Sequence, residues 1–210
     1  MVKSHVNDAS GLLLLCLILS AGGCGKSPGG LTSLDPSAAA DKAVATYDKD
    51  ANGQLSMQEL KACPGIAAAV EHYDKDRSGS VSADEIAQRI RVMQQMPRDN
   101  TPFRCTVNYQ GYPLPNAEVR FQPADFQGDS IMPASGRTDE QGRCNMTVDD
   151  PAWTEQDRLN FGIYCGVYQV GITHASTKIA SRYNTESVLG LNVALDMGRI
   201  GEAAIFNLSK

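Results

Sequence analysis

Two twelve-residue stretches of the chain carry acidic, amide and hydroxyl side chains at matching intervals: DKDANGQLSMQE at 48–59 and DKDRSGSVSADE at 74–85. Both have Asp at the first and third positions, Gly at the sixth, an apolar residue at the eighth and Glu at the twelfth. Carboxylates held this close together repel one another unless a cation lies among them. The repeat therefore predicts two cation sites of one common design.

The oxygen atoms in these stretches match the needs of calcium, which takes roughly six to eight oxygen ligands in a flexible shell. In the first loop the predicted ligands are Asp48, Asp50, Asn52, the backbone carbonyl of Gln54, Ser56 and a bidentate Glu59. In the second loop they are Asp74, Asp76, Ser78, the backbone carbonyl of Ser80, Ser82 and Glu85. Gly53 and Gly79 allow the sharp turn at the sixth position. Ser78 replaces the usual Asp or Asn, so we expect the second site to be weaker.

Apolar residues flank both loops at helical spacing, which predicts a helix on either side of each loop. They are Ala40, Val44 and Tyr47 before the first loop, Ile66, Ala69, Val70 and Tyr73 before the second, and Ile86, Ile90 and Met93 after it. Loops and flanks together resemble a paired EF-hand domain over residues 35–97, in which Leu55 and Val81 would pair as a short β-bridge. The alternative is a pair of acidic turns without an ion, which leaves the bidentate Glu without a purpose.

Cys63-Pro64-Gly65 interrupts the fourteen residues between the two loops. Because Pro disfavours helix at the residue before it, the middle helices are expected to be short, roughly two turns each. This favours a compact structural pair over a switch that opens a groove. Extracellular modules of this kind often bind calcium at about 10⁻⁴–10⁻³ M, and we expect both sites to be filled outside the cytoplasm.

The first 23 residues have the order of a secretory signal peptide: a lead with Lys3, the apolar run LLLLCLILS at 12–20, and then small residues. Cys24 follows directly, and this arrangement resembles the lipobox of bacterial lipoproteins, with Ala21 where Leu is usual. The resemblance implies a lipidated Cys24, a tether over 24–34 and a membrane-anchored protein of the cell envelope. An ordinary signal peptide with a Cys near its cleavage site is the alternative.

Four cysteines remain after this processing: Cys63, Cys105, Cys144 and Cys165. An exported protein can form disulfides, but four thiols allow three complete pairings, and the sequence does not choose among them. Cys-x-x-Cys spacing with a His is absent from the sequence, which argues against zinc.

Residues 98–210 change to alternating patterns with Gly and Pro between them, which predicts short strands. The predicted strands are 103–109, 118–123, 166–174, 188–195 and 202–209, with a strand–turn–strand unit over 135–148. After a linker at 97–102 they predict a β-sandwich, so the expected fold class is α+β in two domains: a small all-α pair and an all-β sandwich.

GYPLPNAEVRFQP, SGRTDEQGRC and YQVGIT in this half resemble the transthyretin-like and carboxypeptidase-regulatory-like fold. The resemblance implies an accessory or binding role without chemistry. One relative of that fold is the hydroxyisourate hydrolase, which uses a C-terminal Tyr-Arg-Gly-Ser and several His and Arg residues. Here the chain ends Phe-Asn-Leu-Ser-Lys, and only His174, with Arg182 nearby, offers comparable side chains.

The net charge of −5 argues against a nucleic-acid partner. Three functions compete: a calcium-stabilised module that binds an envelope protein or a glycan, a calcium-dependent regulator, and a hydrolase. The pair Asp149-Asp150 is read as a solvated turn, Trp153 as a packing residue and 178–187 as a polar connection.

Overall fold

A computed structural model describes residues 30–96, 100–149, 162–197 and 204–210. These residues form a mixture of helices and strands, as expected from the two sequence patterns. The expected signal peptide, the lipidated Cys24, most of the tether and Trp153 lie outside the described residues. Among the residues that are described, the helices are all too short or too polar to cross a membrane.

The helical part begins with the 3₁₀ turn η1 (Gly30–Ser33) and helix α1 (Pro36–Tyr47). The Asp35 side chain accepts a hydrogen bond from the Ala38 amide, and Pro36 takes the first helical position, where no amide donor is needed. Between the two loops lie the 3₁₀ turn η2 (Glu59–Ala62) and the one-turn helices α2 (Pro64–Ala67) and α3 (Val70–Tyr73). Helix α4 (Ala83–Gln94) follows the second loop.

The middle of the helical part is more broken than the expected two-turn helices. Cys63 has non-helical backbone angles directly before Pro64, as predicted, and Ala69 interrupts the chain again between α2 and α3. Ile66, Ala69 and Tyr73 are nevertheless buried, so the helical spacing did mark the residues that face the core.

The strands after residue 99 form a five-stranded sheet in the order β12-β11-β6-β7-β9, and a sheet in which β4 pairs with β13, β5 and β8. The bounds are β4 Arg104–Tyr109, β5 Tyr112–Pro113, β6 Glu118–Pro123, β7 Ala134–Arg137, β8 Arg143–Asn145, β9 Thr147–Val148, β11 Gly166–Thr173, β12 Gly190–Val193 and β13 Ala204–Leu208. Strands β3 (Asn100–Thr101) and β10 (Ile163–Tyr164) pair separately. The 3₁₀ turns η3 (Asp125–Ser130) and η4 (Ser181–Tyr183) complete the elements.

Alternation along β6 decides which side chains enter the core. Its residues are exposed and buried in turn, and Phe121 is completely buried. The Phe121 ring packs against Phe206 of β13 at 6.3 Å and against Tyr168 of β11 at 5.9 Å, measured between ring centroids. Aromatic side chains thus join the two sheets.

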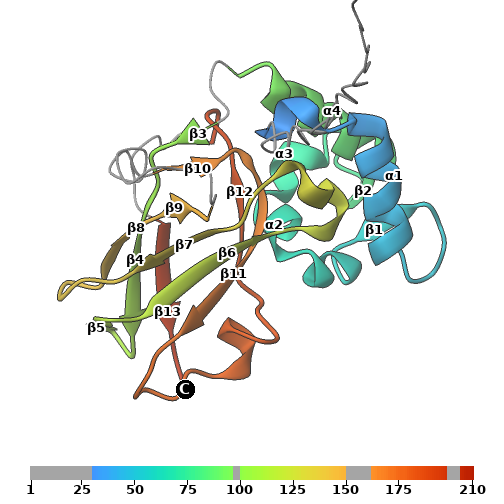
Figure 1. Cartoon of the computed structure of the whole chain (residues 1–210). Helices are drawn as coiled ribbons and strands as arrows, with labels where there is room; N and C mark the ends of the chain where they lie inside the picture. Colours follow the sequence, from blue (N-terminus) through green and yellow to red (C-terminus); the bar gives the residue numbers. More distant parts are fainter. Residues whose placement is uncertain (1–29, 97–99, 150–161, 198–203) are drawn as a thin grey trace, which may run out of the picture.

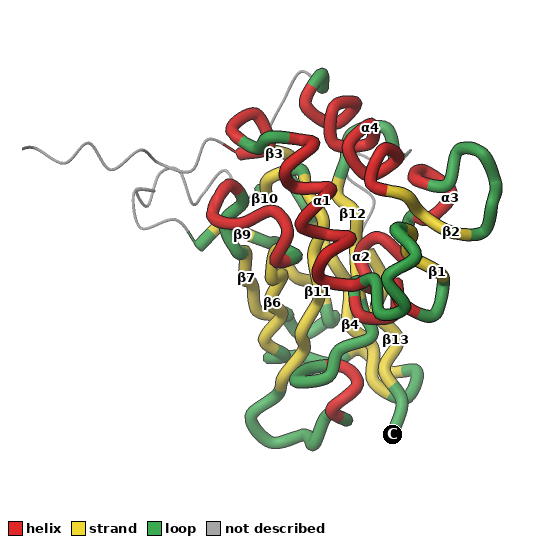
Figure 2. Tube along the Cα trace, turned by 90° about the vertical axis from the view of Figure 1, so that its right-hand side faces the viewer, coloured by secondary structure: helices red, strands yellow, loops and turns green. Residues whose placement is uncertain are grey.

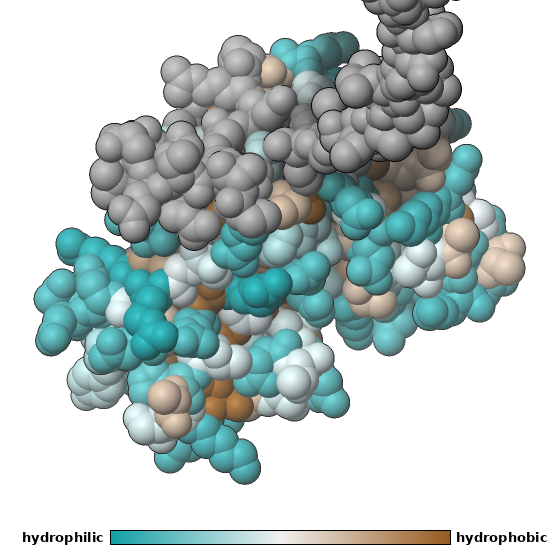
Figure 3. All heavy atoms as spheres, viewed as in Figure 1, coloured by the Kyte–Doolittle hydropathy of each residue, from teal (hydrophilic) through white to brown (hydrophobic). Residues whose placement is uncertain are grey.

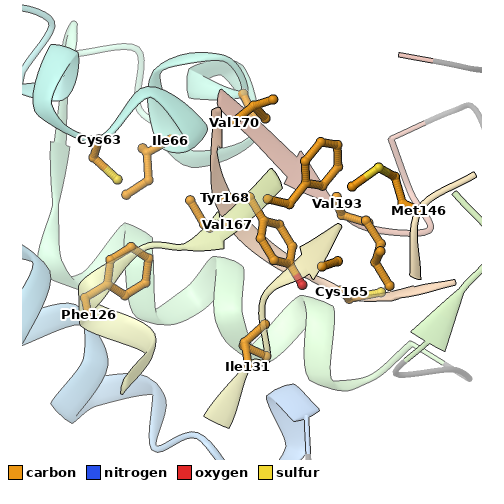
Figure 4. Close-up of a cluster of buried hydrophobic side chains, with 14 of the residues drawn as sticks. Cys63, Ile66, Phe126, Ile131, Met146, Cys165, Val167, Tyr168, Val170 and Val193 are labelled. Atoms are coloured by element: carbon orange, nitrogen blue, oxygen red, sulfur yellow. The ribbon is translucent and has the colours of Figure 1, made fainter. Parts of the chain in front are cut away.

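The helices lie beside one edge of the larger sheet, next to β12 and β11 (Figure 1), and α2 is the helix that packs against these two strands. Figure 2 looks at the molecule from the helical side. The close-up shows Cys63 and Ile66 of the helical part in one buried cluster with Phe126 and Val167 (Figure 4). The contact is tight, because a Cβ on Gly65 would lie 2.6 Å from Val167 Cγ1 and 2.8 Å from the Tyr168 carbonyl oxygen. The helices and the sheet therefore share one hydrophobic core.

Candidate metal centre

The two acidic loops have the same backbone conformation. Ala51 and Arg77, at the fourth position of each loop, have φ angles of 57° and 61°. Gly53 and Gly79, at the sixth position, have φ angles of 81° and 85°. Two left-handed residues within three positions make the backbone curl into a tight loop, so that the side chains before and after the turn point toward one another.

Strands β1 (Gln54–Ser56) and β2 (Ser80–Ser82) hold the loops side by side in an antiparallel pair, with Leu55 opposite Val81 as predicted. Leu55 and Val81 are completely buried and fix the loops to the core. The Ser80 hydroxyl also donates a hydrogen bond to Gln54 Oε1. Gln54, expected to act through its backbone carbonyl, therefore also connects the two loops through its side chain.

Three carboxylates converge in each loop. Asp48, Asp50 and Glu59 each place one oxygen within 4.8 Å of the others, and Asp74, Asp76 and Glu85 do the same. None of the ion pairs between described residues includes any of these six carboxylates. Each loop is a concentrated negative charge that a metal ion can neutralise, so the two clusters can hold a metal ion each.

Backbone amides orient the carboxylates of the first loop. Asp48 Oδ2 accepts from the Gly53 amide at 2.8 Å and Asp50 Oδ1 from the Asn52 amide at 3.2 Å. Asn52 Oδ1 accepts from the Gln54 amide at 2.8 Å. These bonds fix the orientation of the three side chains that the sequence predicts as ligands at the first, third and fifth positions.

Glu59 closes the first loop with both of its carboxylate oxygens. Oε1 accepts from the Lys49 amide at 2.6 Å, and Oε2 accepts from the Ser56 hydroxyl at 2.7 Å and the Ser56 amide at 2.8 Å. The hydrogen bond from the Ser56 hydroxyl, followed by those from the backbone amides, lowers the pKa of Glu59 from 4.5 to about 2. Glu59 is therefore ionised throughout the neutral range, as a metal ligand must be.

The second loop repeats this arrangement at Asp74, Asp76, Ser78 and Glu85. The Ser78 amide donates to Asp74 Oδ1 and Asp76 Oδ1, both at 2.9 Å, and the Gly79 amide donates to Asp74 Oδ2 at 3.0 Å. Hydrogen bonds from Ser78 lower the pKa of Asp76. The Ser78 hydroxyl donates a hydrogen bond to the Ser80 carbonyl oxygen at 3.3 Å, so two predicted ligand groups lie next to each other.

Ser82 and Glu85 have a second role at the start of α4. Ser82 accepts a hydrogen bond from the Glu85 amide at 3.3 Å, and Glu85 Oε2 accepts from the Ser82 amide at 2.9 Å, which is a capping box. The Ser82 hydroxyl donates to the same Glu85 oxygen at 2.9 Å, and the Lys75 amide donates to Oε1 at 2.9 Å. The residues that close the loop thus also begin the helix.

His174 has local backbone partners on both ring nitrogens. Nδ1 accepts from the amides of Ser176 and Thr177 at 3.1 and 2.8 Å, so Nε2 carries the proton and donates to the Pro115 carbonyl at 3.0 Å. Arg182 donates to the Ser209 and Lys210 carbonyls at 3.2 and 2.6 Å. Both side chains hold loops and the C-terminus in place.

Sequence patterns did not reveal an ion pair, with a buried Arg and a partly exposed Asp, that connects α4 to the chain after β12. Arg89 donates to Asp196 at 2.5 and 2.8 Å and to Asn192 Oδ1 at 3.2 Å, while its own side chain is only 3% exposed. The sequence does contain one indication of this pair: Arg89 lies on the apolar side of a predicted helix, and a buried Arg requires a partner of opposite charge.

The outward side of β6, β7 and β11 forms a hollow of about 690 Å³, lined in part by Arg120, Gly136, Gly171 and Asn184. Where the described residues are visible in Figure 3, hydrophobic residues lie in small groups among hydrophilic ones.

Comparisons of the chain with family models, with curated proteins and with solved structures find no match.

Proposed function

We propose that this chain binds two calcium ions through an EF-hand pair and presents a transthyretin-like β-sandwich for a binding or scaffold role at the cell envelope. The observation that carries the calcium assignment is the repetition of one geometry in two loops. Each loop has three converging carboxylates and two left-handed residues at the same positions. Carboxylate, amide, hydroxyl and carbonyl oxygens are the donors that Ca²⁺ prefers.

The anchored location rests on the sequence alone, through the apolar run at 12–20 and Cys24. The binding role of the sandwich rests on its resemblance to transthyretin-like domains and on the hollow over β6, β7 and β11. The partner we propose is an envelope protein or a glycan. We assign no catalytic step, since both nitrogens of His174 already have backbone partners.

Calcium titration calorimetry on residues 25–210 tests the proposal. We expect two sites, one removed by Glu59→Gln and the other by Glu85→Gln, since each change removes one negative charge and the bidentate ligand of its own loop. The second loop should be the weaker one, because Ser78 provides a hydroxyl where Asn52 provides an amide oxygen. Absence of binding heat and of any calcium-dependent change in melting temperature would reject the calcium assignment.

A calcium-dependent regulator is a second candidate, favoured by the connection from Glu85 through α4 to Arg89 and Asp196. If calcium acts as a signal, its removal should increase hydrogen exchange in β12 as well as in the loops. If it only stabilises the fold, exchange in β12 should change only through global unfolding. The Glu85→Gln variant removes the proposed ligand at the start of α4 and leaves the first loop intact. If calcium acts as a signal through α4, hydrogen exchange in β12 should no longer respond to calcium in this variant.

A further inference from the structure

Cys105 and Cys144 lie directly opposite each other on neighbouring antiparallel strands. Strand β4 pairs with β8 in a register that sets Cys105 against Cys144 and Thr106 against Arg143. On either side, the Val107 amide donates to the Gly142 carbonyl at 2.8 Å and the Met146 amide to the Phe103 carbonyl at 3.0 Å. Each of these bonds joins a pair that lies two positions away from the cysteines. Since hydrogen-bonded pairs recur at every second position, the cysteines are also a hydrogen-bonded pair, with Cα atoms about 5.5 Å apart. That separation is within the range that a disulfide spans.

The two thiols point into the interior and meet there. Cys105 is 0% and Cys144 2% exposed, and because the two residues are directly opposite each other their side chains lie on the same face of the sheet. Met146 Sδ lies 3.9 Å from Cys105 Sγ and 3.6 Å from Cys144 Sγ. On the neighbouring strand β7, a Cβ on Gly136 would overlap Cys144 Sγ. The surrounding atoms therefore confine both sulfurs to one small space.

The other two cysteines do not share this arrangement. Cys63 lies in the helical part beside α2, and Cys165 directly precedes β11. Figure 4 shows Cys63 and Cys165 on opposite sides of Val167 and Tyr168. Of the three complete pairings that the sequence allowed, only one contains the Cys105–Cys144 pair. That pairing also requires a disulfide between Cys63 and Cys165, which lie apart.

We propose that Cys105 and Cys144 form a disulfide bond, and that Cys63 and Cys165 remain thiols. The oxidant is a small-molecule disulfide or a disulfide oxidoreductase. One cysteine attacks the reagent disulfide as a thiolate and releases one reagent thiol. The second cysteine then displaces the other reagent thiol as the Sγ–Sγ bond forms, so that two electrons and two protons pass from the protein to the reagent.

The bond closes a loop that contains β5, β6 and β7. Strands β6 and β7 belong to the five-stranded sheet, whereas β4 and β8 belong to the other. The bond therefore keeps segments of both sheets within one closed loop after unfolding, which reduces the conformational entropy of the unfolded chain. The oxidised protein should therefore have the higher melting temperature. This inference is independent of calcium binding.

Trypsin provides a direct test, because cleavage after Arg104 and Arg143 places the two cysteines at the start of separate peptides, 105–120 and 144–158. The intact chain is treated with oxidised glutathione, then unfolded in urea, alkylated there without reductant, and digested. We expect a species that contains both peptides and weighs two hydrogens less than their sum. The peptides 62–75 and 159–178, which carry Cys63 and Cys165, should be alkylated.

Thermal unfolding of the oxidised and reduced protein provides the second measurement. We expect a melting temperature several degrees higher after oxidation. The difference should disappear in Cys105→Ala and persist in Cys63→Ala, which is the matched control because both residues are buried. Alkylated peptides 105–120 and 144–158 after oxidation, or a link that contains Cys63 or Cys165, would overturn the proposal. The peptide map remains decisive even if Cys105→Ala fails to fold.

Discussion

At the scale of single residues, the loops depend on left-handed backbone positions. Gly53 has a φ of 81°, and no atom lies within 4 Å of the place where its Cβ would be. Gly53→Ala should therefore act through the backbone alone and lower the free energy of unfolding by about 1–2 kcal/mol. It should also weaken calcium binding in the first loop and leave the second unchanged. Urea unfolding and calorimetry measure the two effects.

Ala51 provides the opposite test in the same loop. It already has a φ of 57°, so Ala51→Gly should relieve strain and raise the free energy of unfolding by up to about 1 kcal/mol. If Gly53→Ala is neutral, or if Ala51→Gly destabilises the protein, the first loop does not have the conformation described.

Glu59 makes the stability depend on pH. Its pKa is about 2 in the folded protein and 4.5 ordinarily, so between these values the unfolded chain binds more protons. The stability that Glu59 contributes is present above pH 4.5 and should be lost as the pH falls toward 2. Acid titration of the unfolding midpoint should show a flatter curve for Glu59→Gln. An unchanged curve would contradict the role assigned to the Ser56 hydrogen bonds.

At the scale of elements, α2 lies against β12 at a contact that only glycine permits. A Cβ on Gly190 would overlap the backbone of Pro64 and Gly65. Gly190→Ala must therefore push α2 away from the sheet, and we expect it to cost at least about 2 kcal/mol of unfolding free energy. Chemical denaturation measures this cost.

Gly171, on the neighbouring strand β11, is the matched control. Its nearest atom would be the Arg120 carbonyl oxygen, 4.0 Å from an added Cβ. Gly171→Ala should be neutral or slightly stabilising, since an alanine has less freedom in the unfolded chain. Equal costs for the two substitutions would mean that the close approach of α2 to β12 does not exist.

At the scale of the whole molecule, an ion pair between the buried Arg89 of α4 and the partly exposed Asp196 joins this helix to the chain after β12. Asp196→Ala leaves the Arg89 guanidinium buried without its carboxylate, so the change should lower the free energy of unfolding by about 2–4 kcal/mol. The pair Arg137–Glu118 is the control: both side chains are more than half exposed, and Glu118→Ala should cost less than about 1 kcal/mol. Thermal unfolding followed by circular dichroism tests both.

This shared core also predicts how the molecule unfolds. Because the helices and the sheet bury one continuous set of side chains, calcium should raise the melting temperature of the entire chain in a single transition. Two separate transitions, with only the first sensitive to calcium, would contradict this prediction.

Patterns along the chain predicted the elements whose causes are local. The clustered carboxylates of the loops, the β-bridge between Leu55 and Val81, and the turn glycines follow from spacing and from backbone preference, and the alternation in β6 follows from strand geometry. The predicted strand at 188–195 was too long, since β12 covers only Gly190–Val193. Its actual ends depend on the pairing with β11, which lies far away in the sequence.

The sequence by itself determined that two acidic loops of one design lie between helical segments and precede a set of short strands, because each of these features is encoded within a few neighbouring residues. Only the tertiary structure decided how the helices meet the sheet, which cysteines face each other and where Arg89 finds its carboxylate. These contacts join residues far apart in the chain, and their positions result from the packing of one complete core, which no local pattern contains.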